Sequence, residues 1–62
     1  RLSFIDQNIT TIDSYTLRLS NLTILNLTQN NISTIENIPQ KCKELYLDFN
    51  NISGIKNKEH HL

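Results

Sequence analysis

The feature of this 62-residue sequence that most constrains its fold is an internal repeat. The segment from Leu22 to Ile35 reads L-x-x-L-x-L-x-x-N-x-I-x-x-I, and the segment from Cys42 to Ile55 repeats every anchor position twenty residues later, with Cys in place of the first Leu. The N-terminal stretch adds a third copy, L-x-F-x-x-Q-x-I-x-x-I, which is displaced by twenty-three residues. A fixed period of this length is typical of proteins in which each repeat stacks on the next.

The three copies resemble the leucine-rich repeat, L-x-x-L-x-L-x-x-N/C-x-L, over nearly the whole chain. The resemblance implies an α/β-type solenoid with a short parallel β-sheet on its concave side and an irregular or short-helical convex side. We expect one leucine-rich repeat segment over residues 1–62, with a partial repeat at 1–21, repeats at 22–41 and 42–61, and a further repeat opened by Leu62. Because no polar cap is visible at either end, we expect the segment to be part of a longer array.

Asparagine follows the strand-like L-x-L segment in two of the copies. Where the chain leaves a strand and turns, its backbone N–H and C=O groups lose their ladder partners, and a buried unpaired group costs about 1–3 kcal/mol. An inward amide can supply both donors and an acceptor. We therefore predict a structural ladder of side chains that bond the backbone of their own and the adjacent turn, formed by Asn30 and Asn50, with Gln7 at the equivalent position of the first copy.

The residues next to these ladder positions have a different expected role. Asn31 and Asn51 are predicted to face solvent in the turn, where asparagine tolerates unusual backbone angles. The connections between copies also differ. The longer one, residues 13–21, has room for a helical turn capped by Asp13 or Ser14. The shorter one contains Pro39, which favours an extended path.

Composition excludes several classes of protein. Six basic and six acidic residues cancel, and no basic block of the kind that marks nucleic-acid binders is present. No apolar run approaches the 18 or more residues of a membrane span, so we expect no membrane contact by this segment. The sequence has neither an initiator methionine nor the apolar stretch of a signal peptide.

Five sites fit the N-glycosylation acceptor pattern N-x-[ST]. In a protein of the secretory pathway these candidates would be Asn8, Asn21, Asn26, Asn31 and Asn51. The alternative is that three of them arise because the repeat places Asn in its turn and a hydroxyl residue after the next Ile. A glycan on Asn26 would stand on the sheet face and block it.

Cysteine and histidine give no evidence of a metal site. Cys42 stands where Leu22 stands in the previous copy, so we expect a buried thiol that acts as a small hydrophobe. A lone Cys supplies neither a disulfide framework nor a metal site. His60 and His61 are adjacent and lack a spaced third ligand, so a solvated loop is favoured over a zinc site. We expect no metal and no cofactor.

The sequence offers no set of residues for catalysis. The carboxylates are scattered singly, Gly54 is the only glycine, and no nucleophile with a base and an orienting group is apparent. We therefore expect that the segment is not an enzyme.

Binding is expected on the outward face of the strands, because successive side chains of a strand point to opposite sides. Concave surfaces are what solenoid proteins use for binding, and Tyr46 is the best single anchor because Tyr is enriched at interface hot spots. The outward residues form a mixed apolar, hydroxylic and acidic strip: Ser3, Ile5, Ile24, Asn26, Thr28, Glu44, Tyr46 and Asp48. The alternative is a structural spacer that leaves binding to other repeats.

Within the family, the segments NLTILNLTQNNISTI and IPQKCKELYLDFNNIS look most like ectodomain repeats of Toll-like receptors. The resemblance implies a glycoprotein of innate immunity in the extracellular space or endosomal lumen, which recognises a protein or other macromolecular ligand and dimerises. It also admits a nucleic-acid ligand, although the charge of the chain does not indicate one. The competing hypothesis is an intracellular or bacterial leucine-rich repeat scaffold or effector.

Overall fold

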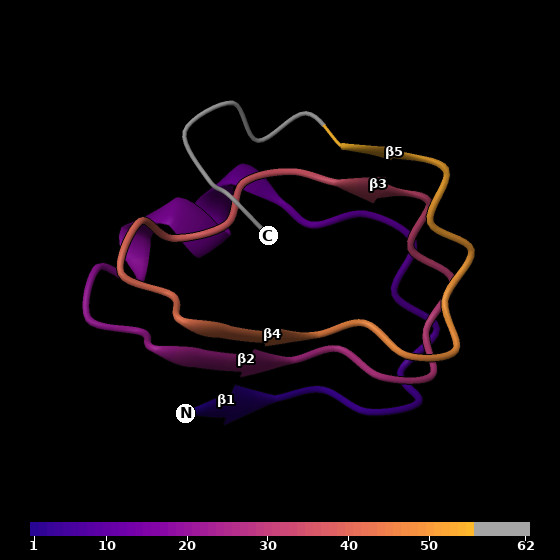
Figure 1. The fold of residues 1–62 in the computed structure, drawn as a ribbon, viewed down its shortest axis with the longest axis horizontal. Coiled ribbons are helices and arrows are strands. Elements are labelled where there is room, and N and C mark those ends of the chain that lie inside the picture. The colour runs from indigo at the N-terminus through magenta and orange to yellow at the C-terminus, as the bar shows by residue number, and fades with distance from the viewer. Residues whose placement is uncertain (56–62) are drawn as a thin grey trace.

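The computed structural model describes residues 1–55, in which the chain winds back over itself (Figure 1). We call residues 1–21, 22–41 and 42–55 the first, second and third coils. The elements are five short strands and one 3-10 helix: β1 (Leu2–Ser3), the helix η1 (Ser14–Arg18), β2 (Ile24–Asn26), β3 (Thr34–Ile35), β4 (Glu44–Tyr46) and β5 (Gly54–Ile55).

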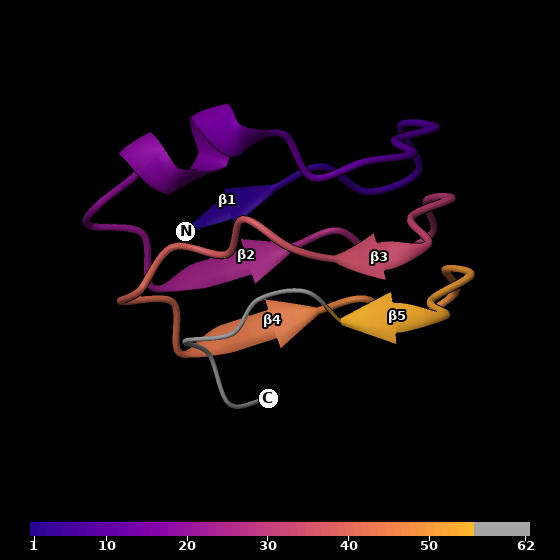
Figure 2. The ribbon, with the colours of Figure 1, turned by 90° about the horizontal axis from the view of Figure 1, so that it is seen from above.

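Parallel pairing joins equivalent strands of successive coils. One sheet has the order β1-β2-β4, in which Leu25 lies opposite Leu2 on one side and Leu45 on the other. These displacements of twenty-three and twenty residues are those of the sequence repeat. Viewed from above, the three strands lie side by side and run in the same direction (Figure 2).

A second parallel sheet, which the sequence analysis did not predict, lies on the opposite side of the coils. It pairs β3 with β5, with Thr34 opposite Gly54 and Ile35 opposite Ile55. These segments occupy equivalent positions of successive coils, twenty residues apart. The equivalent residues of the first coil, Thr11 and Ile12, belong to no strand.

The longer connection forms the helix η1, and Asp13 is its N-cap. The Asp13 carboxylate accepts a hydrogen bond of 2.9 Å from the backbone N–H of Tyr15, which satisfies one of the free donors at the start of the helix. At the end of the helix, the guanidinium carbon of Arg18 lies 4.9 Å from the centroid of the Tyr15 ring, within the range of a cation–π contact.

Asn30 links the first two coils through its side chain. Its Oδ1 accepts hydrogen bonds from the backbone N–H groups of Gln7 and Ile9, and its Nδ2 donates to the carbonyl of Phe4 in the first coil. The same Nδ2 also donates to the carbonyl of Leu27 in its own coil. One buried amide therefore satisfies backbone groups on two successive turns.

Asn50 repeats this arrangement one coil later. Its Oδ1 accepts from the N–H of Ile32, and its Nδ2 donates to the carbonyls of Leu27 and Leu47. In the first coil, the side chain of Gln7 donates only to the carbonyl of Ile5, within its own turn. Each asparagine thus bonds the coil that precedes it.

The backbone angles of the turns differ from the prediction. Asn31 and Asn51 are exposed as expected, but neither is among the residues of the described chain that have positive φ, so the expectation of unusual angles there was wrong. In all three coils the residue before the ladder position has positive φ, at Asp6, Gln29 and Phe49, with φ of 57°, 60° and 59°. The physical reason is that the chain must reverse before the ladder side chain can reach back to carbonyls two and three residues earlier. Asn8, the counterpart of Asn31 in the first coil, also has positive φ, at 56°.

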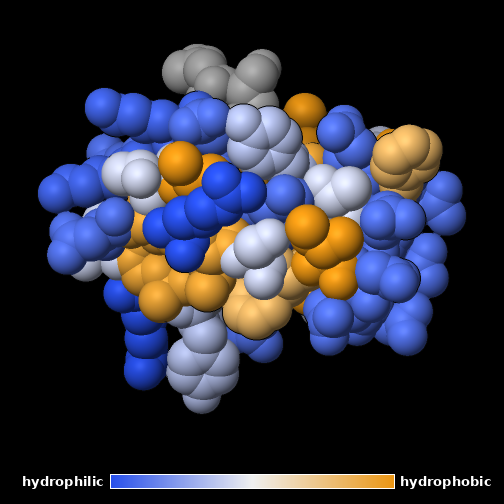
Figure 3. All heavy atoms as spheres, turned by 90° about the horizontal axis from the view of Figure 1, so that it is seen from below, coloured by the Kyte–Doolittle hydropathy of each residue, from blue (hydrophilic) through white to orange (hydrophobic). Residues whose placement is uncertain are grey.

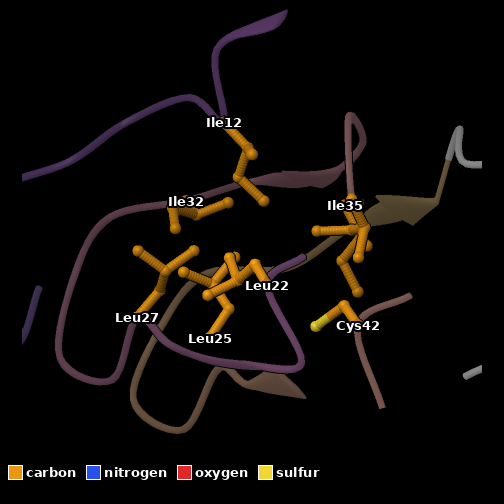
Figure 4. Packing of buried hydrophobic residues seen from close by; sticks show 8 residues of the cluster. Ile12, Leu22, Leu25, Leu27, Ile32, Ile35 and Cys42 are labelled. Atoms are coloured by element: carbon orange, nitrogen blue, oxygen red, sulfur yellow. The ribbon is translucent and has the colours of Figure 1, made fainter. Parts of the chain in front are cut away.

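The apolar core is centred on the second coil. Leu25, Leu27, Ile32 and Ile35 point toward one another, together with Ile12 and Cys42 from the neighbouring coils (Figure 4). The first and third coils cover the second coil from both sides, so side chains of the second coil are more buried than their counterparts in the outer coils.

Equivalent positions show this gradient directly. Ile32 is fully buried, whereas its counterpart Ile52 in the third coil is 36% exposed and the following Ile55 is 62% exposed. On the side of the first coil, Phe4 is half-exposed and lines an apolar hollow of about 340 Å³. The same repeat residue is therefore core in one coil and surface in another.

Candidate binding face

The strand registers bring the outward residues of the three coils side by side. Ser3 of β1 lies opposite Asn26 of β2, which lies opposite Tyr46 of β4. Ile24 likewise lies opposite Glu44. Because their inward neighbours pack into the core, these five side chains share the outer face of one sheet.

The strip continues past the strand ends. The carbonyl of Thr28 accepts from the N–H of Asp6, and that of Asp48 accepts from the N–H of Gln29, so the three coils remain in register there. Ile5 stands at the equivalent position of the first coil and is exposed. All eight residues of the predicted strip are thus exposed or half-buried along one side of the molecule.

Figure 3 views this side of the molecule, below the β1-β2-β4 sheet of Figure 1. Apolar side chains gather in a band across the lower middle of this view, with hydrophilic side chains over and around them. A surface of this mixed composition resembles the surfaces of non-obligate protein interfaces, which are about as apolar as the rest of a protein surface.

Tyr46 and Glu44 form a hydrogen-bonded pair on the face. The Tyr46 hydroxyl donates to Glu44 Oε1 at 2.7 Å. This hydrogen bond, followed by the negative charge of Glu44, raises the pKa of Tyr46 above its usual value, and Arg1 opposes the shift. The pair fixes the direction of the phenol and combines an aromatic surface with a carboxylate.

Asn26 occupies the middle of the face and is half-buried. Its Oδ1 accepts from both the N–H and the hydroxyl of Thr28, at 3.1 and 2.6 Å. The two polar residues therefore hold each other in place, between Ser3 on one neighbouring strand and Tyr46 on the other. A sugar on Asn26 would cover these neighbours.

The other glycosylation candidates lie away from this face. Asn8, Asn21, Asn31 and Asn51 are all exposed. The backbone N–H of Asn31 donates to the carbonyl of Ile9, and that of Asn51 donates to the carbonyl of Ile32. Their side chains thus project from turns whose backbone is held in place.

Cys42 is a free thiol packed in the core beneath the face. Its Sγ donates to the carbonyl of Glu44 at 3.4 Å. Burial raises the pKa of the thiol, while backbone hydrogen bonding at Glu44 and Leu25 opposes the rise. The neutral thiol is the form that suits this environment.

Two residues with defined roles were missed by the sequence analysis. Asn37 has a φ of 56°, and its Nδ2 donates to the carbonyl of Ile12 at 2.7 Å, which ties the second coil to the first on the side opposite the face. Phe49 projects from its left-handed position with 81% of its surface exposed. An Asn just before Ile38 and Pro39 was a usable signal for the first residue, whereas nothing in the repeat pattern marks Phe49.

Residues 1–55 show neither a cluster of metal ligands nor a membrane-spanning helix. Within that range, no group of three or more His, Cys, Asp or Glu side chains is placed to hold a metal ion. None of the helices there is long and apolar enough to cross a bilayer. His60, His61 and Leu62 lie outside the described residues.

Comparison of the chain with protein-family models, curated proteins and solved structures yields no match.

Proposed function

We propose that this chain is a recognition segment of a leucine-rich repeat protein, of the type found in innate-immune receptor ectodomains. The observation that carries the proposal is the register that sets Ser3, Asn26 and Tyr46 side by side on the outer face of a parallel sheet. The asparagine side chains that link successive coils, and the displacement of equivalent strands by one repeat, support the assignment to this repeat class.

Recognition, and not catalysis, is the proposed role of the face. Tyr46 supplies an aromatic anchor, Glu44 and Asp48 supply charge, and Ile5 and Ile24 supply apolar area. This combination suits a protein or other macromolecular ligand, with an aromatic hot spot and a polar surround. Receptor dimerisation belongs to the same proposal.

The proposed cellular location is tested by measuring the mass of the intact protein, taken from its native source, before and after enzymatic removal of N-glycans. A loss of mass assigned to any of the exposed sequons places the chain in the secretory pathway and supports a receptor in the extracellular space or endosomal lumen. A protein without N-glycans favours the intracellular or bacterial alternative.

The face is tested by binding to an array of secreted and cell-surface proteins. We expect a partner whose affinity falls at least about tenfold in Tyr46→Ala or Asp48→Ala. Tyr15→Ala is the matched control, because Tyr15 is also an exposed aromatic residue but lies on the η1 helix. Equal binding by all four proteins would identify the segment as a structural spacer.

A further inference from the structure

A second surface, formed by the turns at the ends of the strands, has a different chemical character. There a polar hollow of about 310 Å³ spans all three coils. It is lined by Asp6, Asn8, Gln29, Asn30, Asn31 and Phe49. The repeat brings these residues together, because Asp6, Gln29 and Phe49 are equivalent positions of successive coils.

Most of the polar groups around this hollow are available to a ligand. Within residues 1–55, the side chains of Asp6, Asn8, Gln29 and Asn31 make no hydrogen bond or ion pair, and all four are exposed. Asn30 is the exception, since its amide is committed to the backbone. The hollow therefore presents three amides and one carboxylate, which together offer both donors and acceptors.

The aromatic side of the hollow is Phe49. Its ring is almost fully exposed, and its backbone has a φ of 59°. Positive φ is uncommon for a bulky side chain: it costs on the order of 1–3 kcal/mol and persists only where the surrounding structure imposes it. In the two preceding coils the equivalent position holds a polar residue, so the turn itself does not require an aromatic side chain.

The scaffold beneath these side chains is well fixed. The N–H of Asp6 bonds the carbonyl of Thr28 at 3.1 Å, and the N–H of Gln29 bonds the carbonyl of Asp48 at 2.8 Å. The N–H of Asn31 bonds the carbonyl of Ile9. Side chains on such turns keep their relative positions, which reduces the entropy lost when a ligand binds.

The ligand chemistry that fits is that of a neutral sugar. A pyranose ring has a C–H face that an aromatic ring can cover, and hydroxyl or acetamido groups at its edge that amides and carboxylates can bond. We propose that this hollow binds a saccharide, with Phe49 beneath the sugar ring and Asp6, Asn8, Gln29 and Asn31 around its edge. With one carboxylate and no cationic side chain in its lining, the hollow does not suit an anionic ligand.

The saccharide has two available sources. One is an N-glycan attached at Asn8 or Asn31, since both begin sequons and both line the hollow. The other is a free oligosaccharide. The attached glycan rests on the secretory location proposed above, whereas the free sugar does not, so the two sources are tested separately.

Free sugar is tested with unglycosylated protein, by recording amide chemical shifts while N-acetylglucosamine trimer or maltotriose is added. We expect shift changes at residues 6–8, 29–31 and 49, and affinity at least about tenfold weaker in Phe49→Ala. Phe49→Asn serves as a second variant, because Asn accepts positive φ and preserves the turn while it removes the ring. Tyr15→Ala is the control and should bind as the unmodified protein does.

Binding of an attached N-glycan in the hollow is tested with protein secreted from a eukaryotic host. We expect removal of the glycan at Asn31 or Asn8 to lower the melting temperature, and Phe49→Asn to abolish that difference. An effect that depends on Phe49 in either experiment supports the proposal and identifies the source. If the Phe49 variants fold and change neither free-sugar binding nor the effect of glycan removal, the saccharide proposal is wrong. Absence of N-glycans from the native protein would contradict only the proposed secretory location.

Discussion

The side chain of Asn50 donates to the carbonyl of Leu27 at 2.8 Å and so ties the third coil to the second. The same carbonyl also accepts from Asn30 at 3.0 Å, so two amides converge on one backbone group. The two asparagines differ in burial, because Asn30 is enclosed by coils on both sides, whereas Asn50 is only half-buried.

We expect Asn30→Ala to lower the free energy of unfolding by about 3 kcal/mol, because it leaves buried backbone groups of two coils unpaired. Asn50→Ala should cost about 1–2 kcal/mol, because water can reach part of its site. Urea denaturation followed by circular dichroism measures both values. Asn51→Ala is the control, since this exposed neighbour should change stability by no more than about 0.5 kcal/mol. Equal losses at Asn30 and Asn50 would contradict the difference in burial.

Phe49→Asn should stabilise the protein by about 1 kcal/mol, because Asn adopts the left-handed conformation more readily than Phe and the exposed ring contributes little to packing. Phe49→Val should have the opposite sign, since a β-branched side chain is least compatible with positive φ. Thermal unfolding of the two variants checks the signs. A lower stability for Phe49→Asn would mean that the ring makes a stabilising contact within the protein.

Cys42 should react slowly with a disulfide reagent in the native protein at neutral pH. Its thiol is buried and its pKa is raised, so both access and the thiolate fraction are low. The rate should rise to that of an ordinary thiol when urea unfolds the chain. Immediate reaction of the folded protein would show that Cys42 is accessible.

The raised pKa of Cys42 also sets a pH dependence of stability. The unfolded chain releases the thiol proton at a lower pH than the folded chain does, so stability should fall as pH rises from the ordinary pKa of a thiol toward the raised folded-state value. Cys42→Ala should lack this part of the pH profile. Identical profiles for the two proteins would rule out a contribution from the thiol.

Tyr46 should ionise at a higher pH than a free tyrosine, because its hydroxyl donates to Glu44 and the carboxylate disfavours the phenolate. Tyrosinate absorbance in a Tyr15→Phe background follows Tyr46 alone, since the chain has only two tyrosines. Glu44→Gln should lower the pKa toward its usual value, whereas Asp48→Asn should leave it unchanged. A pKa that does not respond to Glu44→Gln would mean that the pair is absent in solution.

Much of the backbone arrangement could be predicted from the sequence by itself. The spacings of twenty and twenty-three residues determined which strands pair and that they pair in parallel, because each repeat returns its strand to the same edge of the molecule. The L-x-L pattern also predicted which side chains face the core and which face outward, since successive residues of a strand point to opposite sides. Asp13 was also predictable as a cap, because a carboxylate before a helical turn can satisfy its free N–H groups.

Tertiary structure decided the features that depend on contacts between coils. The sequence pattern treats Ile32 and Ile52 as equivalent, yet only the first is enclosed, because burial depends on what lies on either side of a coil. The left-handed conformation of Phe49 is imposed by its turn and not by its own preference, so a local pattern could not reveal it. For the same reason the polar hollow beside Phe49 became visible only when residues 23 and 20 positions apart were brought to one surface.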